Sequence, residues 1–160
     1  MKLGWRHLRS TFQVLIVVAG LAACASPPPP PPKPTIIQAT IDVRPSTNPD
    51  PRGRPSPVVL RFYELKSLAP FSSADFFSLF DRDKEVLAAE LVAREEYQLT
   101  PGENRQFERK LQPETRYIAV IAAFRDLERA QWRASMPVVP QQTTPVVIRL
   151  EASNVSLGGR

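Results

Sequence analysis

The chain has 160 residues, of which 42% are hydrophobic and 23% are charged, and this is enough for one domain with a buried core. Its formal charge is +5, but three of the positive charges lie in an N-terminal segment that we expect to be removed, which leaves +2. A balance of +2 is too weak for a nucleic-acid-binding surface, so no nucleic-acid partner is expected.

Residues 1–23 have the form of an export signal. The cationic residues Lys2, Arg6 and Arg9 precede a largely apolar run, Phe12–Ala23, which ends in small side chains. The alternative is a membrane anchor that stays attached, but such an anchor needs about 20 apolar residues and this run is shorter. We therefore expect residues 1–23 to be a cleaved signal peptide.

The only cysteine, Cys24, follows Leu21-Ala22-Ala23, and this order resembles the bacterial lipoprotein box. In such proteins the signal is cut before the cysteine, which then carries acyl chains that hold the protein firmly on a membrane. The alternative is a chance cysteine beside an ordinary cleavage site, which would leave an oxidisable thiol in an exported chain. We expect Cys24 to be lipidated.

A proline run, Pro27–Pro32, follows the cysteine and continues through Lys33 and Pro34. Such a run favours polyproline II, and at about 3.1 Å per residue it would span roughly 25 Å. It could alternatively be a ligand for a proline-binding domain. Directly after a lipidated cysteine we favour a tether over residues 24–34, followed by a folded domain over residues 35–160.

From residue 35 onward the hydrophobic pattern mostly repeats every second residue, which predicts strands. TIIQATIDV places Ile37, Ala39, Ile41 and Val43 on one face, and TRYIAVIAAF is apolar on both faces, as in a central strand covered on both sides. Other predicted strands are PVVLRFYEL, RQFERKL, QWRASMPV and TPVVIRLEASNVSL. The range Thr100–Glu103 has the proline and glycine of a type II turn. Together they predict a mainly all-β fold, a β-sandwich.

Residues 72–92 break the alternation and predict a short helical insert. Ser72 stands three residues before Asp75, which resembles a capping box, and Val86–Val92 would form a second helix or lead into a strand. Four large apolar side chains lie close together in this segment: Phe76, Phe77, Leu79 and Phe80. We expect them to pack against the sheet, and the alternative is an exposed aromatic patch for a partner.

The chain offers little catalytic chemistry once His7 is removed and Cys24 is lipidated. Ser-His-Asp and Cys-His mechanisms and the usual zinc sites then lack their residues, so neither an enzyme nor a cofactor is expected. Residues 81–85 alternate acids with bases, and we expect a solvated charged face there because a calcium loop needs more oxygens and a glycine.

Two other functions remain open. A glycan-acting enzyme would need two converging carboxylates, and no pair stands out in the sequence. A lipid-anchored binding module for glycan or peptide would need an aromatic groove, built from residues such as Tyr63, Tyr117 or Trp132. We expect Trp132 to pack in the core or at a strand edge instead.

The segment RPSTNPDPRGRPSP, residues 44–57, lies between the first two predicted strands and is much longer than a hairpin loop. Its prolines limit the freedom of the unfolded loop, so that less entropy would be lost when it binds a partner. Arg44, Arg52 and Arg54 outnumber the single acid, Asp50, which predicts a mildly cationic contact. The alternative is a floppy surface loop.

The order of these features resembles the TssJ family, the outer-membrane lipoproteins of the type VI secretion system. The resemblance spans nearly all of the mature chain. Three long stretches carry it, besides the lipidated start: RPSPVVLRFYELKS at residues 54–67, ADFFSLFDRDKEVLAAELVAREEYQLTPGE at 74–103, and AAFRDLERAQWR at 122–133. The proline run is not part of the family pattern.

The resemblance implies a transthyretin-like β-sandwich with an added helical segment. It also implies that the loop between the first two strands binds the periplasmic C-terminal domain of TssM, with TssL as an indirect partner. Ala25 stands where an aspartate would favour inner-membrane retention, so acyl chains on Cys24 would hold the periplasmic domain on the outer membrane. Mapped by position, that loop is residues 44–57, and no family motif inside it fixes individual contacts. Our own candidates within the loop are Arg44, Asn48, Pro49, Asp50, Arg52, Gly53 and Arg54.

Overall fold

The computed structural model describes residues 30–159. The predicted signal peptide, Cys24 and the first residues of the proline run lie outside the described residues. No helix in the described range is both long enough and apolar enough to cross a membrane.

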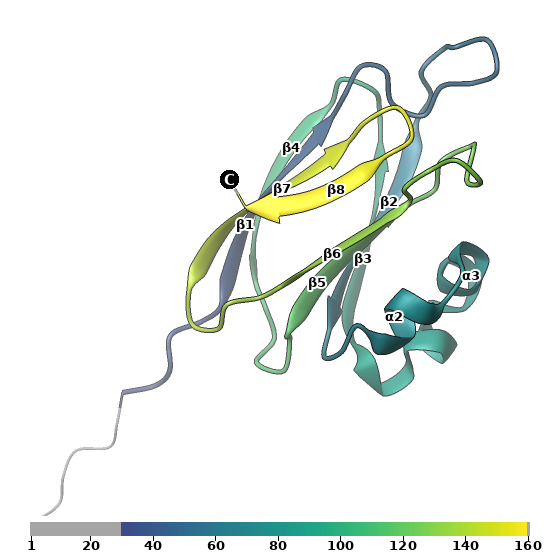
Figure 1. Cartoon of the computed structure of the whole chain (residues 1–160). Helices are drawn as coiled ribbons and strands as arrows, with labels where there is room; N and C mark the ends of the chain where they lie inside the picture. The colour runs from purple at the N-terminus through teal and green to yellow at the C-terminus, as the bar shows by residue number, and fades with distance from the viewer. Residues whose placement is uncertain (1–29, 160) are drawn as a thin grey trace, which may run out of the picture. The chain divides into compact units, whose positions relative to one another are not determined.

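Two four-stranded sheets make up the domain (Figure 1). The first has the order β4-β1-β7-β8, and the second has the order β3-β2-β5-β6. Strand β1 pairs in parallel with β7, and the other neighbouring strands are antiparallel. The strands of the first sheet are β1 (Ile36–Val43), β4 (Asn104–Lys110), β7 (Thr143–Leu150) and β8 (Val155–Gly159). Those of the second are β2 (Val58–Leu65), β3 (Leu91–Leu99), β5 (Tyr117–Ala122) and β6 (Arg133–Pro137).

The main core lies between the two sheets, as the alternating pattern predicts. Strand β1 turns Ile37, Ala39, Ile41 and Val43 inward, and none of the four is more than 2% exposed. Their counterparts on β2 are also fully buried, and Val120 of β5 lies in the same cluster. The predicted β-sandwich is therefore confirmed.

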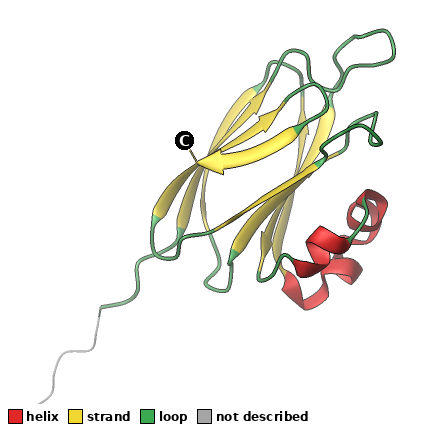
Figure 2. Ribbon diagram, viewed as in Figure 1, coloured by secondary structure: helices red, strands yellow, loops and turns green. Residues whose placement is uncertain are grey.

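The outer face of the second sheet is also buried, because a helical insert between β2 and β3 covers it (Figure 2). Tyr63 of β2 and Ala119 and Ile121 of β5 point outward from the sheet and are no more than 1% exposed. Strand β5 is thus covered on both faces, as predicted.

The insert begins with the short helix α2 (Ala69–Ser73), continues with α3 (Phe76–Leu87), and ends with the 3-10 turn η1 (Ala88–Glu90). The predicted cap at Ser72 is wrong, because Ser72 lies inside α2. A proline in the first turn of α2 starts this separate helix. Asp75, in extended conformation, caps α3 instead, and its carboxylate accepts a hydrogen bond of 2.9 Å from the backbone N–H of Ser78.

Three of the four large apolar residues of α3 pack against the domain, as predicted. Phe76 and Leu79 are buried, and Phe80 is partly buried. Trp132 meets the Phe76 ring edge-on at 5.4 Å, which confirms a packing role for Trp132. Phe77 differs, because 64% of it is exposed.

The expected solvated face at residues 81–85 is wrong at Asp83, which is 4% exposed. Helix α3 breaks at Arg82, whose φ of −136° is not helical. Asp83 lies just past this break, where its carboxylate accepts hydrogen bonds from Arg94 at 2.8 Å and from the Tyr63 hydroxyl at 3.3 Å. The break was not visible in the pattern of charged residues.

The predicted turn at Thr100–Glu103 is present. The Glu103 N–H donates to the Thr100 carbonyl at 3.0 Å, and Gly102 has a positive φ of 83°. The turn carries the chain from β3 in the second sheet to β4 in the first.

Candidate functional site

The loop of residues 44–57 lies at one end of the sandwich, where β1 ends and β2 begins (Figure 1). Three other connections share this end because the paired strands end there together: the β3–β4 turn, the β5–β6 loop of residues 123–132, and the β7–β8 turn of residues 151–154. The polypeptide enters the domain at the opposite end, beside Ile36.

The tip of the loop is a small hairpin. The Asp50 N–H donates to the Arg54 carbonyl at 2.8 Å, and the Gly53 N–H donates to the Asp50 carbonyl at 2.8 Å. Gly53 has a φ of 77°, the left-handed position that such three-residue hairpin loops require. The tip is therefore a defined turn.

The carboxylate of Asp50 organises this turn. It accepts hydrogen bonds from the N–H groups of Arg52 at 2.8 Å and Arg54 at 2.9 Å, and from the Arg54 guanidinium at 2.8 Å. The backbone N–H of Arg54, followed by its side chain, holds the pKa of Asp50 below its usual range. Asp50 and Arg54 thus neutralise each other within the loop.

Asn48 joins the loop to its two neighbours. Its N–H donates to the Ala152 carbonyl at 2.9 Å, and its side-chain oxygen accepts from the Arg125 N–H at 2.8 Å. Its side-chain nitrogen donates to the Pro57 carbonyl at 2.7 Å. With a φ of 53° and 3% exposure, Asn48 is a buried residue whose side chain is fully engaged inside the protein.

The base of the loop is held equally well. Thr47 is fully buried, and its hydroxyl donates to the Leu150 carbonyl at 3.0 Å. The Ser56 N–H donates back to the Thr47 carbonyl at 3.2 Å. The loop is therefore ordered, and the alternative of a floppy loop does not fit these contacts.

The predicted contact residues fall into two groups. Arg44, Arg52, Gly53 and Arg54 are exposed, and Pro49 and Asp50 are partly exposed. Asn48 alone is buried. Arg44 and Arg52 form no ion pair with any residue between 30 and 159, so their charges are free to meet a partner.

A pocket of about 520 Å³ lies where three of these connections meet. Sequence reasoning missed it, because its walls come from parts of the chain that are far apart. The pocket is lined by Asn48, Pro49, Asp50, Pro51, Phe124, Arg125, Asp126, Arg129, Ala152 and Ser153.

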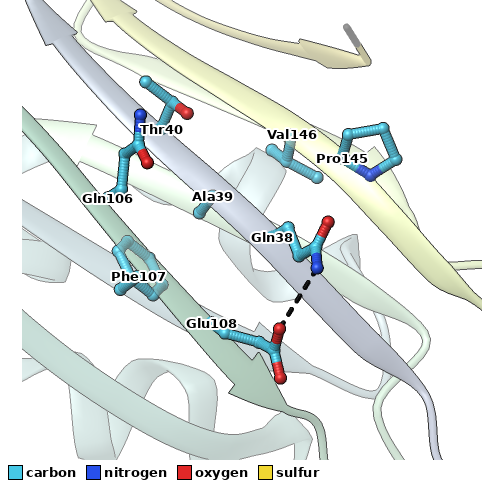
Figure 3. Close-up of a pocket in the computed structure, with 8 residues that line it drawn as sticks. All are labelled: Gln38, Ala39, Thr40, Gln106, Phe107, Glu108, Pro145 and Val146. Carbon is cyan, nitrogen blue, oxygen red and sulfur yellow. Dashed lines mark hydrogen bonds between the residues drawn. The ribbon is translucent and has the colours of Figure 1, made fainter.

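A second depression, of about 480 Å³, lies on the first sheet across β4, β1 and β7 (Figure 3). Its polar lining includes the amides of Gln38 and Gln106 and one carboxylate, Glu108, to which the Gln38 side chain donates at 3.2 Å. A single carboxylate does not supply the acid pair that glycoside hydrolysis needs.

The buried carboxylates of the described residues do not converge either. Glu64 lies between the sheets, where Arg109 donates to it at 3.2 Å. Asp83 lies on the outer side of the second sheet. Within residues 30–159, no three acids, histidines or cysteines gather as a metal site.

The three aromatic residues proposed for a glycan- or peptide-binding groove do not form one. Tyr63 is fully buried beneath the helical insert. Trp132 and Tyr117 are partly buried and pack against the same cluster.

Comparison with known proteins agrees with this fold. The profile of the type VI secretion lipoprotein family (T6SS-SciN; VasD, EvfM, TssJ) matches residues 35–153. No curated protein sequence matches significantly.

Solved structures are similar over most of the chain. The T6SS lipoprotein TssJ1 from Pseudomonas aeruginosa is 38% identical, with a TM-score of 0.78, over 79% of this chain and 97% of that one. Lip from Serratia marcescens, a membrane-bound component of the type VI secretion system, is 27% identical with a TM-score of 0.68, over 79% and 98%. A chain in the structure described as the C-terminal domain of the T6SS protein TssM from EAEC is 28% identical with a TM-score of 0.65, over 76% and 99%.

Proposed function

Because the chain belongs to the type VI secretion lipoprotein family, we propose that it binds the periplasmic C-terminal domain of TssM and so anchors the secretion system's membrane complex to the outer membrane. The role is one of binding, without catalysis or a cofactor. The observation that carries the proposal is the ordered loop of residues 44–57, with a buried base and an exposed, cationic tip.

Two of the structural relatives support this choice of partner and place. One relative is a chain in a structure named for the C-terminal domain of TssM, and another is described as membrane-bound. Both align over nearly their whole length with this chain, so the likeness covers the entire folded domain.

The position of the loop suits a partner that reaches across the periplasm. Strand β1 runs from Ile36 to Val43, and eight residues of strand span about 26 Å. The tether therefore enters at one end, and the loop is displayed at the other. Lipid on Cys24 would confine the domain to the membrane surface and raise its effective concentration near the partner.

The free charges of the loop define the chemistry of the contact. Arg44 and Arg52 are exposed and have no acidic partner within the described part of the chain. We expect an acidic patch on the TssM domain and an affinity that falls as salt rises.

The test is the affinity of the lipidated protein, in detergent, for the purified periplasmic domain of TssM. The double variant Arg44→Glu and Arg52→Glu should bind about tenfold more weakly, because each reversed charge would face an acidic patch. The matched control is Lys66→Glu with Lys110→Glu, which changes net charge equally at the opposite end of the sandwich.

The control variant should bind within about twofold of the wild type. If the wild-type protein shows no binding, the proposed function is wrong. If both variants lose affinity equally, net charge rather than the loop accounts for the effect.

A further inference from the structure

The lining of the pocket between the three connections suggests what enters it. Two proline rings, Pro49 and Pro51, lie on the side of the long loop, and Phe124 contributes a ring that is 4% exposed. At about 520 Å³ the pocket has the volume of a small ligand site. The apolar part of its lining, formed by the two prolines, Phe124 and Ala152, suits an apolar group.

The pocket is held in shape before any partner arrives. Asn48 is hydrogen-bonded to all three of its walls, namely its own loop at Pro57, the β5–β6 loop at Arg125, and the β7–β8 turn at Ala152. The prolines and the hairpin at the tip further restrict the loop. Little conformational entropy is therefore lost when the pocket is filled.

The charges around the pocket are unequally satisfied. Asp50 is occupied by Arg54, and Asp126 lies 3.7 Å from the exposed guanidinium of Arg129. Arg125 forms no ion pair with any residue from 30 to 159, although its charge contributes, after Arg54, to the lowered pKa of Asp50. One guanidinium at the pocket is therefore available for an anion.

We propose that this pocket receives an apolar side chain of the partner together with a neighbouring carboxylate, which pairs with Arg125. The inference rests on the proposed binding of the TssM periplasmic domain. A single carboxylate suits the site better than a phosphate, because Asp50 and Asp126 would repel a dianion.

The size of a stable interface supports a second contact beside the loop tip. A specific interface buries about 800 Å² on each partner, contributed by about 20 residues. The exposed tip comprises only residues 51–55. The pocket adjoins this tip through Pro51, so one partner surface can cover both.

The experiment fills the pocket and separately removes its charge. Ala152 is exposed on the β7–β8 turn and lines the pocket, so Ala152→Trp puts an indole into it. Ala89→Trp places the same side chain at an exposed position on η1 and is the control. Arg125→Gln removes the cation but keeps the backbone N–H, which donates a hydrogen bond to the side-chain oxygen of Asn48.

We expect Ala152→Trp to weaken TssM binding about tenfold and Ala89→Trp to leave it unchanged. Arg125→Gln should weaken binding severalfold and make the affinity less sensitive to salt. Thermal unfolding of each variant reports whether it folds. If Ala152→Trp does not fold, Arg125→Gln still tests the proposal.

Two failures are distinguishable. If the wild type binds TssM and the Arg44/Arg52 variant is impaired, but Ala152→Trp and Arg125→Gln bind normally, only the pocket assignment is overturned. If the wild type does not bind TssM at all, the proposed function falls and the pocket assignment falls with it.

Discussion

The guanidinium of Arg61 makes two contacts with Phe80. Its Nη1 donates to the Phe80 carbonyl in helix α3, and its central carbon lies 4.2 Å from the centre of the Phe80 ring. The helix breaks at Arg82, and the Lys84 N–H donates to the Asp83 side chain at 2.8 Å. A side chain from the sheet therefore supplies a donor to a carbonyl at the break.

Replacing Arg61 should loosen the helical insert. Arg61→Met would remove the donor to Phe80 and would leave Asp83 with less compensation for its buried charge. We expect a loss of about 3 kcal/mol in the free energy of unfolding, measured with urea. Arg105→Met, which breaks an exposed pair with Glu103, should cost about 1 kcal/mol or less. Equal losses in the two variants would contradict the role assigned to Arg61.

Alkaline pH should weaken the attachment of the same insert. Burial raises the pKa of Tyr63 from 10.0 to about 12. Between these values the unfolded chain has lost this proton while the folded protein keeps it, so stability falls as pH rises. Below pH 10 the contribution is fully present.

The expected loss from Tyr63 is about 2–3 kcal/mol between pH 10 and pH 12. It is measured as the difference in unfolding free energy between the wild type and Tyr63→Phe, which cancels the titration of other groups. A difference that stays constant from pH 9 to pH 12 would be inconsistent with the raised pKa.

Ala88 should be replaceable by glycine with a gain in stability. It ends helix α3 with a φ of 44° and a ψ of −120°, a conformation that side chains disfavour and glycine adopts freely. Ala88→Gly should raise the unfolding free energy by about 1 kcal/mol. Its neighbour Ala89 has no positive φ, so Ala89→Gly should lower it slightly. A destabilised Ala88→Gly variant would refute the strain.

Lipidation is tested at Cys24. Cys24→Ser should leave the domain of residues 35–160 folded, with an unchanged melting temperature, but should release it from the membrane fraction. It should also abolish assembly of the secretion system, because the complex would lose its attachment. Normal membrane fractionation of this variant would show that the anchor lies elsewhere.

Periodicity in the sequence was sufficient for most of the strands. The alternation from Ile37 to Val43 corresponds to a strand with one buried face. The segment that is apolar on both sides corresponds to β5, which is buried on both faces. Both patterns are local, so no knowledge of the rest of the chain is needed to interpret them. The long loop between β1 and β2 is likewise visible in its prolines.

The features that were missed depend on contacts between distant residues. Asn48 is hydrogen-bonded to Arg125, which is 77 positions away, and no local sequence pattern predicts that hydrogen bond. In the sequence, Asp83 cannot be distinguished from the other four charged residues of 81–85. In the fold, the helix breaks beside Asp83 and Arg94 lies within hydrogen-bonding distance of it. The pocket beside the loop combines three separate connections, so it exists only in the folded chain.

Strand β1 gives the domain a direct mechanical path. The segment proposed as a tether ends just before β1 begins, and the loop of residues 44–57 starts where β1 ends. Tension between the membrane and a bound partner would therefore pull lengthwise on this one strand. Because β1 is hydrogen-bonded to β4 on one side and β7 on the other, the load would act as shear on two ladders at once. Because β1 is an interior strand of the first sheet, it would carry this force in shear and would not be peeled away as an edge strand would.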